Sequence, residues 1–272
     1  MSASRPQIQA ALVQLDELTR RLRRECPWDR EQDERTIVPH TLEEAYELAD
    51  AAQRRDDAKL VDELGDVLFQ VHFLALLLEE RGAGSLAEVA EHAREKLIRR
   101  HPHIFGSAEA DDADAVLRTW DRVKQGEPGR EPGVFGEVPE NLPAPLYARK
   151  VQRRAASSGF DFPGVEGPLQ ALRDELEELA AVVDAEGEAG RDARFHEVGD
   201  VLFAAVNVAR KLKVDPELAL RAAGDRFRGR VEAAAALAAA QGRDWRALGA
   251  DEQLAFYAQA RLREPQPGDR HA

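Results

Sequence analysis

The chain has 272 residues, 43% of them hydrophobic and 33% charged, a composition typical of a helix-rich globular protein of one or two domains. Its net charge of −13 argues against a general binder of nucleic acid or of anionic membranes, since both need a basic face. A single cysteine, no signal-peptide-like run and no apolar stretch of membrane-spanning length lead us to expect a cytoplasmic protein without membrane or nucleic-acid partners.

Helical periodicity dominates the chain, and no run of alternating strand residues appears, so the sequence predicts an all-α fold. In the first half we expect helices at these places: residues 7–24, from about Thr41 with Glu44 at the capping-box position, residues 57–81, and from Ser85 to just before Pro102. A stretch dense in Gly and Pro follows at residues 124–145 and has the character of a linker.

The order of helices recurs after this linker. A basic amphipathic helix, an acidic helix, a helix opening with E-x-x-D and a helix ending in arginines follow one another in both halves. The offset from Glu44 to Glu175 is 131 residues, and that from Asp66 to Asp200 is 134. Nearly constant offsets indicate an internal duplication.

We therefore predict two similar helical-bundle domains in tandem. The predicted boundaries are an N-terminal domain at 1–125, a linker at 126–144, a C-terminal domain at 145–263 and a disordered tail at 264–272.

Acidic residues lie one turn apart on two predicted helices of each half. They are Glu44, Glu47, Glu63 and Asp66 in the first half, and Glu175, Glu178, Glu197 and Asp200 in the second. The first stripe becomes apolar further along, so we expect it to face inward, where close carboxylates repel one another. A divalent cation removes that conflict, and oxygen ligands suit Mg²⁺ or Mn²⁺ better than zinc. A solvated acidic face is the ordinary alternative for any single pair.

The two stripes differ beyond the carboxylates. Asn207 and Lys211 continue the second stripe where the first has Phe73 and Leu77. Polar groups there make the second pocket the better candidate for a polar ligand.

Cations and aromatic residues complete the candidate site. The cations, which either cap helix ends or bind phosphate, are Lys96, Arg99, Arg100, Arg226 and Arg230. Trp28 and Phe160 occupy matching turns, and each either fills the core or stacks against a base.

These segments together resemble the MazG family of nucleoside triphosphate pyrophosphohydrolases. The resemblance spans residues 8–262 and is carried by "CPWDREQ", "TLEEAYELADA", "DELGDVLFQ", "RRHPHIF", "GFDF", "DELEEL", "EVGDVLFAAVNVAR" and "DRFRGR". It implies Mg²⁺-dependent hydrolysis between the α and β phosphates, giving a nucleoside monophosphate and pyrophosphate, mainly in the C-terminal domain. It also implies a homodimer.

The resemblance assigns the eight carboxylates to metal binding. We expect Glu178 or Glu47 to deprotonate the attacking water. The charge on the leaving pyrophosphate would be stabilised by Lys96, Arg100, Arg226 and Arg230. The substrate-binding residues we expect are Asn207, Lys211, Trp28, Phe160 and Arg99.

Two departures from the family pattern concern the phosphate-binding cations. Arg226 stands where the family commonly has Lys, and Gly229 where a second Arg is usual. A non-catalytic nucleotide-binding regulatory module is the alternative function, and it predicts binding without turnover.

Overall fold

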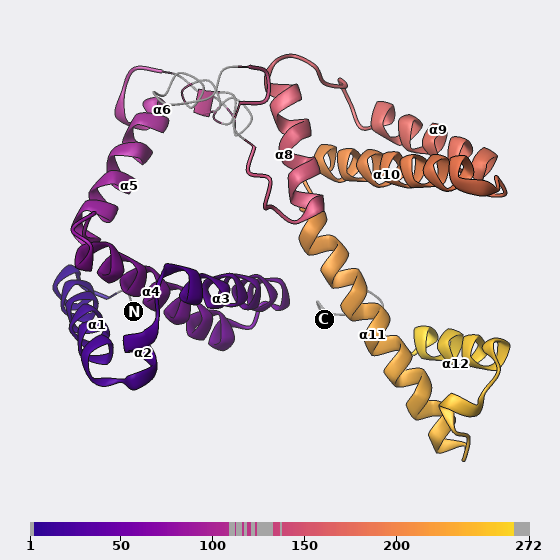
Figure 1. Ribbon diagram of the computed structural model, residues 1–272, viewed down its shortest axis with the longest axis horizontal. Coiled ribbons are helices and arrows are strands. Elements are labelled where there is room, and N and C mark those ends of the chain that lie inside the picture. The colour runs from indigo at the N-terminus through magenta and orange to yellow at the C-terminus, as the bar shows by residue number, and fades with distance from the viewer. Residues whose placement is uncertain are drawn as a thin grey trace. The chain divides into compact units, whose positions relative to one another are not determined.

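The computed structural model describes residues 3–108, 112, 116, 119–120, 123, 133–136 and 138–263. In these residues the regular structure is helical and contains no strand, which confirms the all-α prediction. The chain forms two compact units, Met1–Pro128 and Gly129–Ala272 (Figure 1). The expected tail at 264–272 and residues 126–132 and 137 of the expected linker lie outside the described residues. None of the helices described has the length and apolarity needed to cross a membrane.

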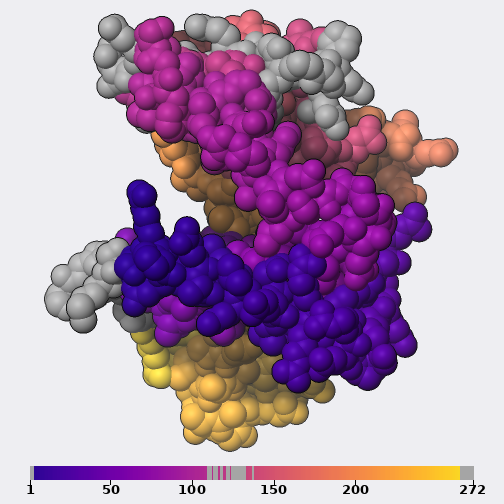
Figure 2. All heavy atoms as spheres, turned by 90° about the vertical axis from the view of Figure 1, so that its left-hand side faces the viewer, coloured from indigo at the N-terminus to yellow at the C-terminus, as the bar shows by residue number. Residues whose placement is uncertain are grey.

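The first unit is organised around one central helix, α4. Its described helices are α1 (Arg5–Glu25), α2 (Pro27–Glu31), α3 (Glu34–Arg54), α4 (Asp57–Glu80), α5 (Leu86–Arg100) and α6 (Pro102–Phe105). Helix α4 packs against α1, α3 and α5. In the space-filling view the first four helices form one continuous indigo-to-purple surface (Figure 2). Its core joins Ile37 of α3 to Phe73 and Leu77 of α4.

Helix α3 begins earlier than the sequence patterns predict. Asp33 caps it, because its side chain accepts hydrogen bonds from the backbone N–H groups of Arg35 and Thr36. Thr41, the expected start, lies inside the helix, with Oγ1 3.2 Å from Oε1 of Gln70 on α4. Pro39 within α3 removes one backbone donor, yet the capped first turn and the tertiary contact hold the helix together.

The second unit repeats the helical hairpin and adds a longer C-terminal part. Its elements are α8 (Ala144–Ser157), α9 (Glu166–Val182), α10 (Gly187–Lys211), α11 (Pro216–Ala240), the 3₁₀ turn η1 (Trp245–Ala247) and α12 (Ala250–Leu262). Helices α9 and α10 lie side by side, and α8 packs on α10 and α11 (Figure 1). The main apolar cluster lies elsewhere, between α11 and α12, where Ala234, Ala238 and Phe256 are buried.

Two predicted helix ends in this unit are wrong. Helix α10 begins ten residues before Glu197, so the E-x-x-D pair lies within the helix and not at its opening. Helix α11 continues ten residues beyond Arg230, so the arginines occupy its middle. The extension is rich in alanine, the residue with the highest helix propensity, and it packs against α12.

Candidate metal and nucleotide site

The first hairpin, α3–α4, brings three carboxylates together, which we call the first cluster. Glu44 of α3 and Glu63 and Asp66 of α4 each offer an oxygen, and these oxygens lie within 4.8 Å of one another. Glu63 is only 1% exposed. Its Oε2 is buried and receives no hydrogen bond from the described residues. A buried oxygen of this kind is costly unless a cation or donor meets it.

Burial and mutual repulsion act on Glu44 in this cluster. Burial raises the pKa of Glu44, and the neighbouring carboxylates of Asp66, Glu47 and Glu63 raise it further. The pKa of Glu44 is raised because no positive charge near it, among the described residues, offsets burial and the neighbouring carboxylates.

A lysine lies at the edge of the first cluster. The Lys59 ammonium forms an ion pair with Glu63, one turn along α4. The same Nζ lies 3.7 Å from Oε2 of Glu47 on α3 and 3.6 Å from Oδ2 of Asp62. Glu63 and the other two carboxylates raise the pKa of Lys59. Glu47 is therefore engaged with Lys59.

The second hairpin, α9–α10, forms the second cluster. Oxygens of Glu175 and Glu178 on α9 and of Glu197 on α10 lie within 4.8 Å of one another. Burial raises the pKa of Glu175, and the nearby charges of Asp200, Glu178 and Glu197 add to this effect. Asp200, the fourth predicted ligand, is thus close enough to act on the cluster electrostatically.

The donor sets of both clusters fit a hard divalent cation. They consist of carboxylate oxygens from two adjacent helices, which are ligands that hard divalent cations prefer. The buried Oε2 of Glu63, which lacks a donor, is the observation in the structure that supports a cation. Carboxylates alone favour Mg²⁺ or Mn²⁺ over zinc.

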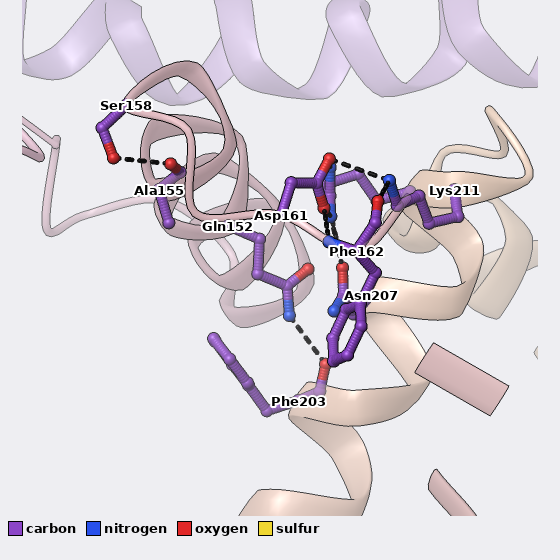
Figure 3. A network of polar contacts seen from close by, with 9 residues as sticks. Gln152, Ala155, Ser158, Asp161, Phe162, Phe203, Asn207 and Lys211 are labelled. Carbon is purple, nitrogen blue, oxygen red and sulfur yellow. Dashed lines mark hydrogen bonds and ion pairs between the residues drawn. The ribbon is translucent and has the colours of Figure 1, made fainter. Parts of the chain in front are cut away.

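Asn207 and Lys211 lie in a polar network at the end of α10 (Figure 3). Lys211 Nζ donates to Asp161 Oδ2 at 2.8 Å, and Arg210 Nη1 donates to the same oxygen at 3.2 Å. Arg210 also donates from Nη2 to Asn207 Oδ1 at 2.7 Å. Asp161 precedes α9, in the loop that follows α8, so the network ties this loop to α10.

Asp161 is the anion of this network. Burial by itself raises the pKa of Asp161, but hydrogen bonds from Arg210 and Lys211 outweigh burial and lower the pKa to about 2. Lys211 also donates to the backbone carbonyl of Phe162. The loop is therefore fixed by charge-assisted hydrogen bonds.

Both aromatic residues of the matching turns are accessible. Phe160 is 83% exposed and directly precedes Asp161. Trp28 is 50% exposed, with its ring edge-on to His40 at 5.6 Å between centroids. Asp29 is the buried residue of the first turn. Neither ring fills the core.

The predicted phosphate-binding cations lie on other helices than the carboxylates. Lys96, Arg99 and Arg100 are on α5, which packs on α4. The Arg100 guanidinium stacks over the ring of Trp120 at 5.2 Å from its centroid. Arg226 and Arg230 lie one turn apart on α11, which contacts α8, α10 and α12.

Three residues of these sites were missed from the sequence: Lys59, Asp161 and Arg210. The four-residue spacing of Lys59 and Glu63 is a signal for an ion pair on one helix face. Asp161 has no such local signal, because its partners lie 49 and 50 residues away.

Comparison with known proteins gives consistent similarities. A model of the MazG nucleotide pyrophosphohydrolase domain matches residues 32–105, which contain the first cluster. A nucleoside triphosphate pyrophosphohydrolase of Escherichia coli K12 is 38% identical over 225 residues, 80% of this chain and 83% of the relative. The nucleoside triphosphate pyrophosphohydrolase/pyrophosphatase MazG of Thermotoga maritima is 40% identical over 203 residues, 74% and 76% of the two chains. A nucleoside triphosphate pyrophosphohydrolase of Mycobacterium tuberculosis is 31% identical over 170 residues, 62% of this chain and 50% of the relative.

Proposed function

The chain belongs to the MazG family of nucleoside triphosphate pyrophosphohydrolases, and from this premise we propose that it hydrolyses nucleoside triphosphates between the α and β phosphates, with Mg²⁺ and mainly in the second unit. The products are a nucleoside monophosphate and pyrophosphate. Mn²⁺ is the alternative metal, since it accepts the same oxygen ligands.

One observation supports the second unit as the place of hydrolysis. Helix α10 bears Asn207 and Lys211 beyond its metal ligands, in a polar network. The corresponding residues of α4, Phe73 and Leu77, are buried in the core of the first unit. The second stripe thus offers polar groups at the two positions where the first stripe is apolar.

The distance along α10 from the second cluster to Asn207 and Lys211 is similar to the length of a nucleotide. Asn207 and Lys211 lie seven and eleven residues beyond Asp200, about 10 Å and about 16 Å along the helix axis on the same face. A nucleotide whose phosphates are held at the second cluster extends along this stripe towards the loop of Phe160 and Asp161. The accessible Phe160 ring is then available to stack on the base.

The residues of the second unit divide the chemical work. When bound, a divalent ion would neutralise phosphate charge, make the phosphorus more electrophilic and make the attacking water more acidic. Glu178 is exposed and belongs to the cluster, so it is placed to accept the proton of the attacking water. Arg226 and Arg230 supply positive charge for the pyrophosphate leaving group. Glu47, Lys96 and Arg100 would have the matching roles in the first unit.

A repeated apolar stripe supports a homodimer. Large apolar side chains are exposed at equivalent positions of α4 and α10, in the pairs Val61 and Phe195, Leu64 and Val198, and Leu68 and Leu202. An exposed apolar stripe of this kind marks an association surface. Replacing Leu68 and Leu202 together by Glu should convert a dimer to a monomer in sedimentation equilibrium, whereas Leu254→Glu on α12 should not.

Product analysis tests the reaction. The protein is incubated with Mg²⁺ and each common nucleoside triphosphate, and the products are separated by ion-exchange chromatography. We expect monophosphate and pyrophosphate in equal amounts. Diphosphate with inorganic phosphate would contradict the assigned bond, and nucleotide binding without turnover would favour the regulatory module.

A further inference from the structure

The first cluster already has a positive charge attached to it. Lys59 pairs with the fully buried Glu63 and approaches Glu47, so its ammonium lies against carboxylates of both helices of the hairpin. Two of these carboxylates are predicted metal ligands. A divalent cation that binds through Glu63 and Glu47 must displace this ammonium or share its ligands with it.

The second cluster has no equivalent of this lysine. The offset of 134 residues that relates Glu63 to Glu197 and Asp66 to Asp200 relates Lys59 to Ala193. Ala193 lies on α10, one turn before Glu197, as Lys59 lies one turn before Glu63. An alanine brings no charge, so this position supplies no counter-charge to the second cluster.

We propose that Lys59 is a tethered counter-ion that suppresses divalent-cation binding at the first cluster, and that the difference between Lys59 and Ala193 determines which unit binds the metal. The proposal rests on the metal-dependent function proposed above. It makes Lys59 a residue that selects the active unit without touching the substrate. The competition is electrostatic: one tethered charge lowers the attraction of the cluster for a second cation.

Mn²⁺ titration of full-length variants tests this, because the electron paramagnetic resonance signal of free Mn²⁺ reports binding without any turnover. The double substitution Glu197→Gln and Asp200→Asn leaves only the first cluster. In that background we expect Lys59→Ala and Lys59→Met to lower the Kd for Mn²⁺ at least tenfold, while Lys59→Arg, which keeps the charge, changes it less than twofold. Arg54→Ala is the matched control, because it removes a cation paired with Asp50 on the same hairpin.

The reciprocal change is made in the second cluster. With Glu63→Gln and Asp66→Asn as background, Ala193→Lys should raise the Kd for Mn²⁺ at least tenfold. In the Glu197→Gln and Asp200→Asn background, which keeps Glu63, Lys59→Ala removes the partner of this buried carboxylate. That variant should therefore have a lower melting temperature without metal, and Mn²⁺ should restore it. If Lys59→Ala does not fold without metal, the Kd values of Lys59→Met and Ala193→Lys test the proposal.

The outcomes separate this proposal from the function it rests on. An unchanged or higher Kd in folded Lys59→Ala and Lys59→Met, or an unchanged Kd in Ala193→Lys, overturns the role of Lys59. Failure of the second cluster to bind Mn²⁺ in the chain with Ala193 instead overturns the proposed metal-dependent function. In that case, a lower Kd for Mn²⁺ at the first cluster of the Lys59→Ala variant still supports the role of Lys59 as a counter-ion.

Discussion

The hairpins α3–α4 and α9–α10 carry the same acidic pattern in different surroundings. In the first unit α4 is packed on α1, α3 and α5, and Glu63 of this helix is fully buried. In the second unit the main apolar cluster lies between α11 and α12, and most of α10 remains accessible. A duplicated motif can thus be absorbed into a core in one copy and remain available for a ligand in the other.

The charges around the two clusters differ in the same direction. The first cluster has Lys59 as an internal partner, and the second has Ala193 at that position. The polar groups that continue the second stripe are instead held by Asp161. The first cluster therefore has one lysine as a partial counter-charge, and the corresponding position of the second cluster carries no charge.

The largest expected effect is that of removing a predicted metal ligand from the second unit. Asp200→Asn should lower kcat/KM by about 10³-fold, since even residues that only support a ligand cost 10- to 100-fold. Asp66→Asn should change it less than about threefold, because we propose that turnover takes place in the second unit. Pyrophosphate release measures both, with circular dichroism as the control for folding. Equal losses in the two variants would contradict the asymmetry.

Stability should show the opposite asymmetry. Phe73→Ala should lower the free energy of unfolding by about 3 kcal/mol, because Phe73 is fully buried against Ile37 and Leu77. Asn207→Ala, at the equivalent position, should cost about 1 kcal/mol, the contribution of a hydrogen bond. Urea denaturation followed by circular dichroism compares the two. A larger loss of stability for Asn207→Ala than for Phe73→Ala would contradict this asymmetry.

Asp161 should affect substrate binding more than chemistry. Asp161→Asn weakens the attachment of the Phe160 loop to α10, so KM should rise about fivefold, roughly the effect of 1 kcal/mol, with kcat nearly unchanged. Asp161→Glu should restore part of the loss. Asp251→Asn on α12 removes an exposed charge as a control. A fall in kcat at constant KM would show that the network acts on catalysis instead.

The smallest expected effect is the pH dependence of metal affinity. Glu44 and Glu175 have raised pKa values, so each takes up a proton at a higher pH than an ordinary glutamate. Protonation removes a ligand charge, and Mn²⁺ affinity should therefore fall, roughly threefold, as the pH is lowered from about 7 towards the raised pKa.

The metal-free protein should respond in the opposite sense at these two residues. The folded state holds their protons more tightly than the unfolded state, so their contribution to stability grows as the pH falls through the raised pKa. Mn²⁺ titrations and thermal melts at each pH measure both effects. Glu44→Gln and Glu175→Gln should flatten the profiles, and an unaltered profile would rule out these carboxylates as the source.

The sequence by itself determined the helical class, the duplication and the pairing of acidic residues on helix faces. These features follow from periodicity, because residues three or four apart meet on one side of a helix wherever that helix lies. The positions of Glu63 and Asp66, one turn apart on α4, needed no tertiary information.

Only the tertiary structure decided where α3 begins, that α11 extends to Ala240, and that Asp161 holds Lys211. Each depends on contacts with distant segments, such as Thr41 with Gln70 or α11 with α12. The burial of individual carboxylates also depends on such tertiary contacts. Glu63 and Glu197 have matching places in the repeat, but packing fully buries only the first.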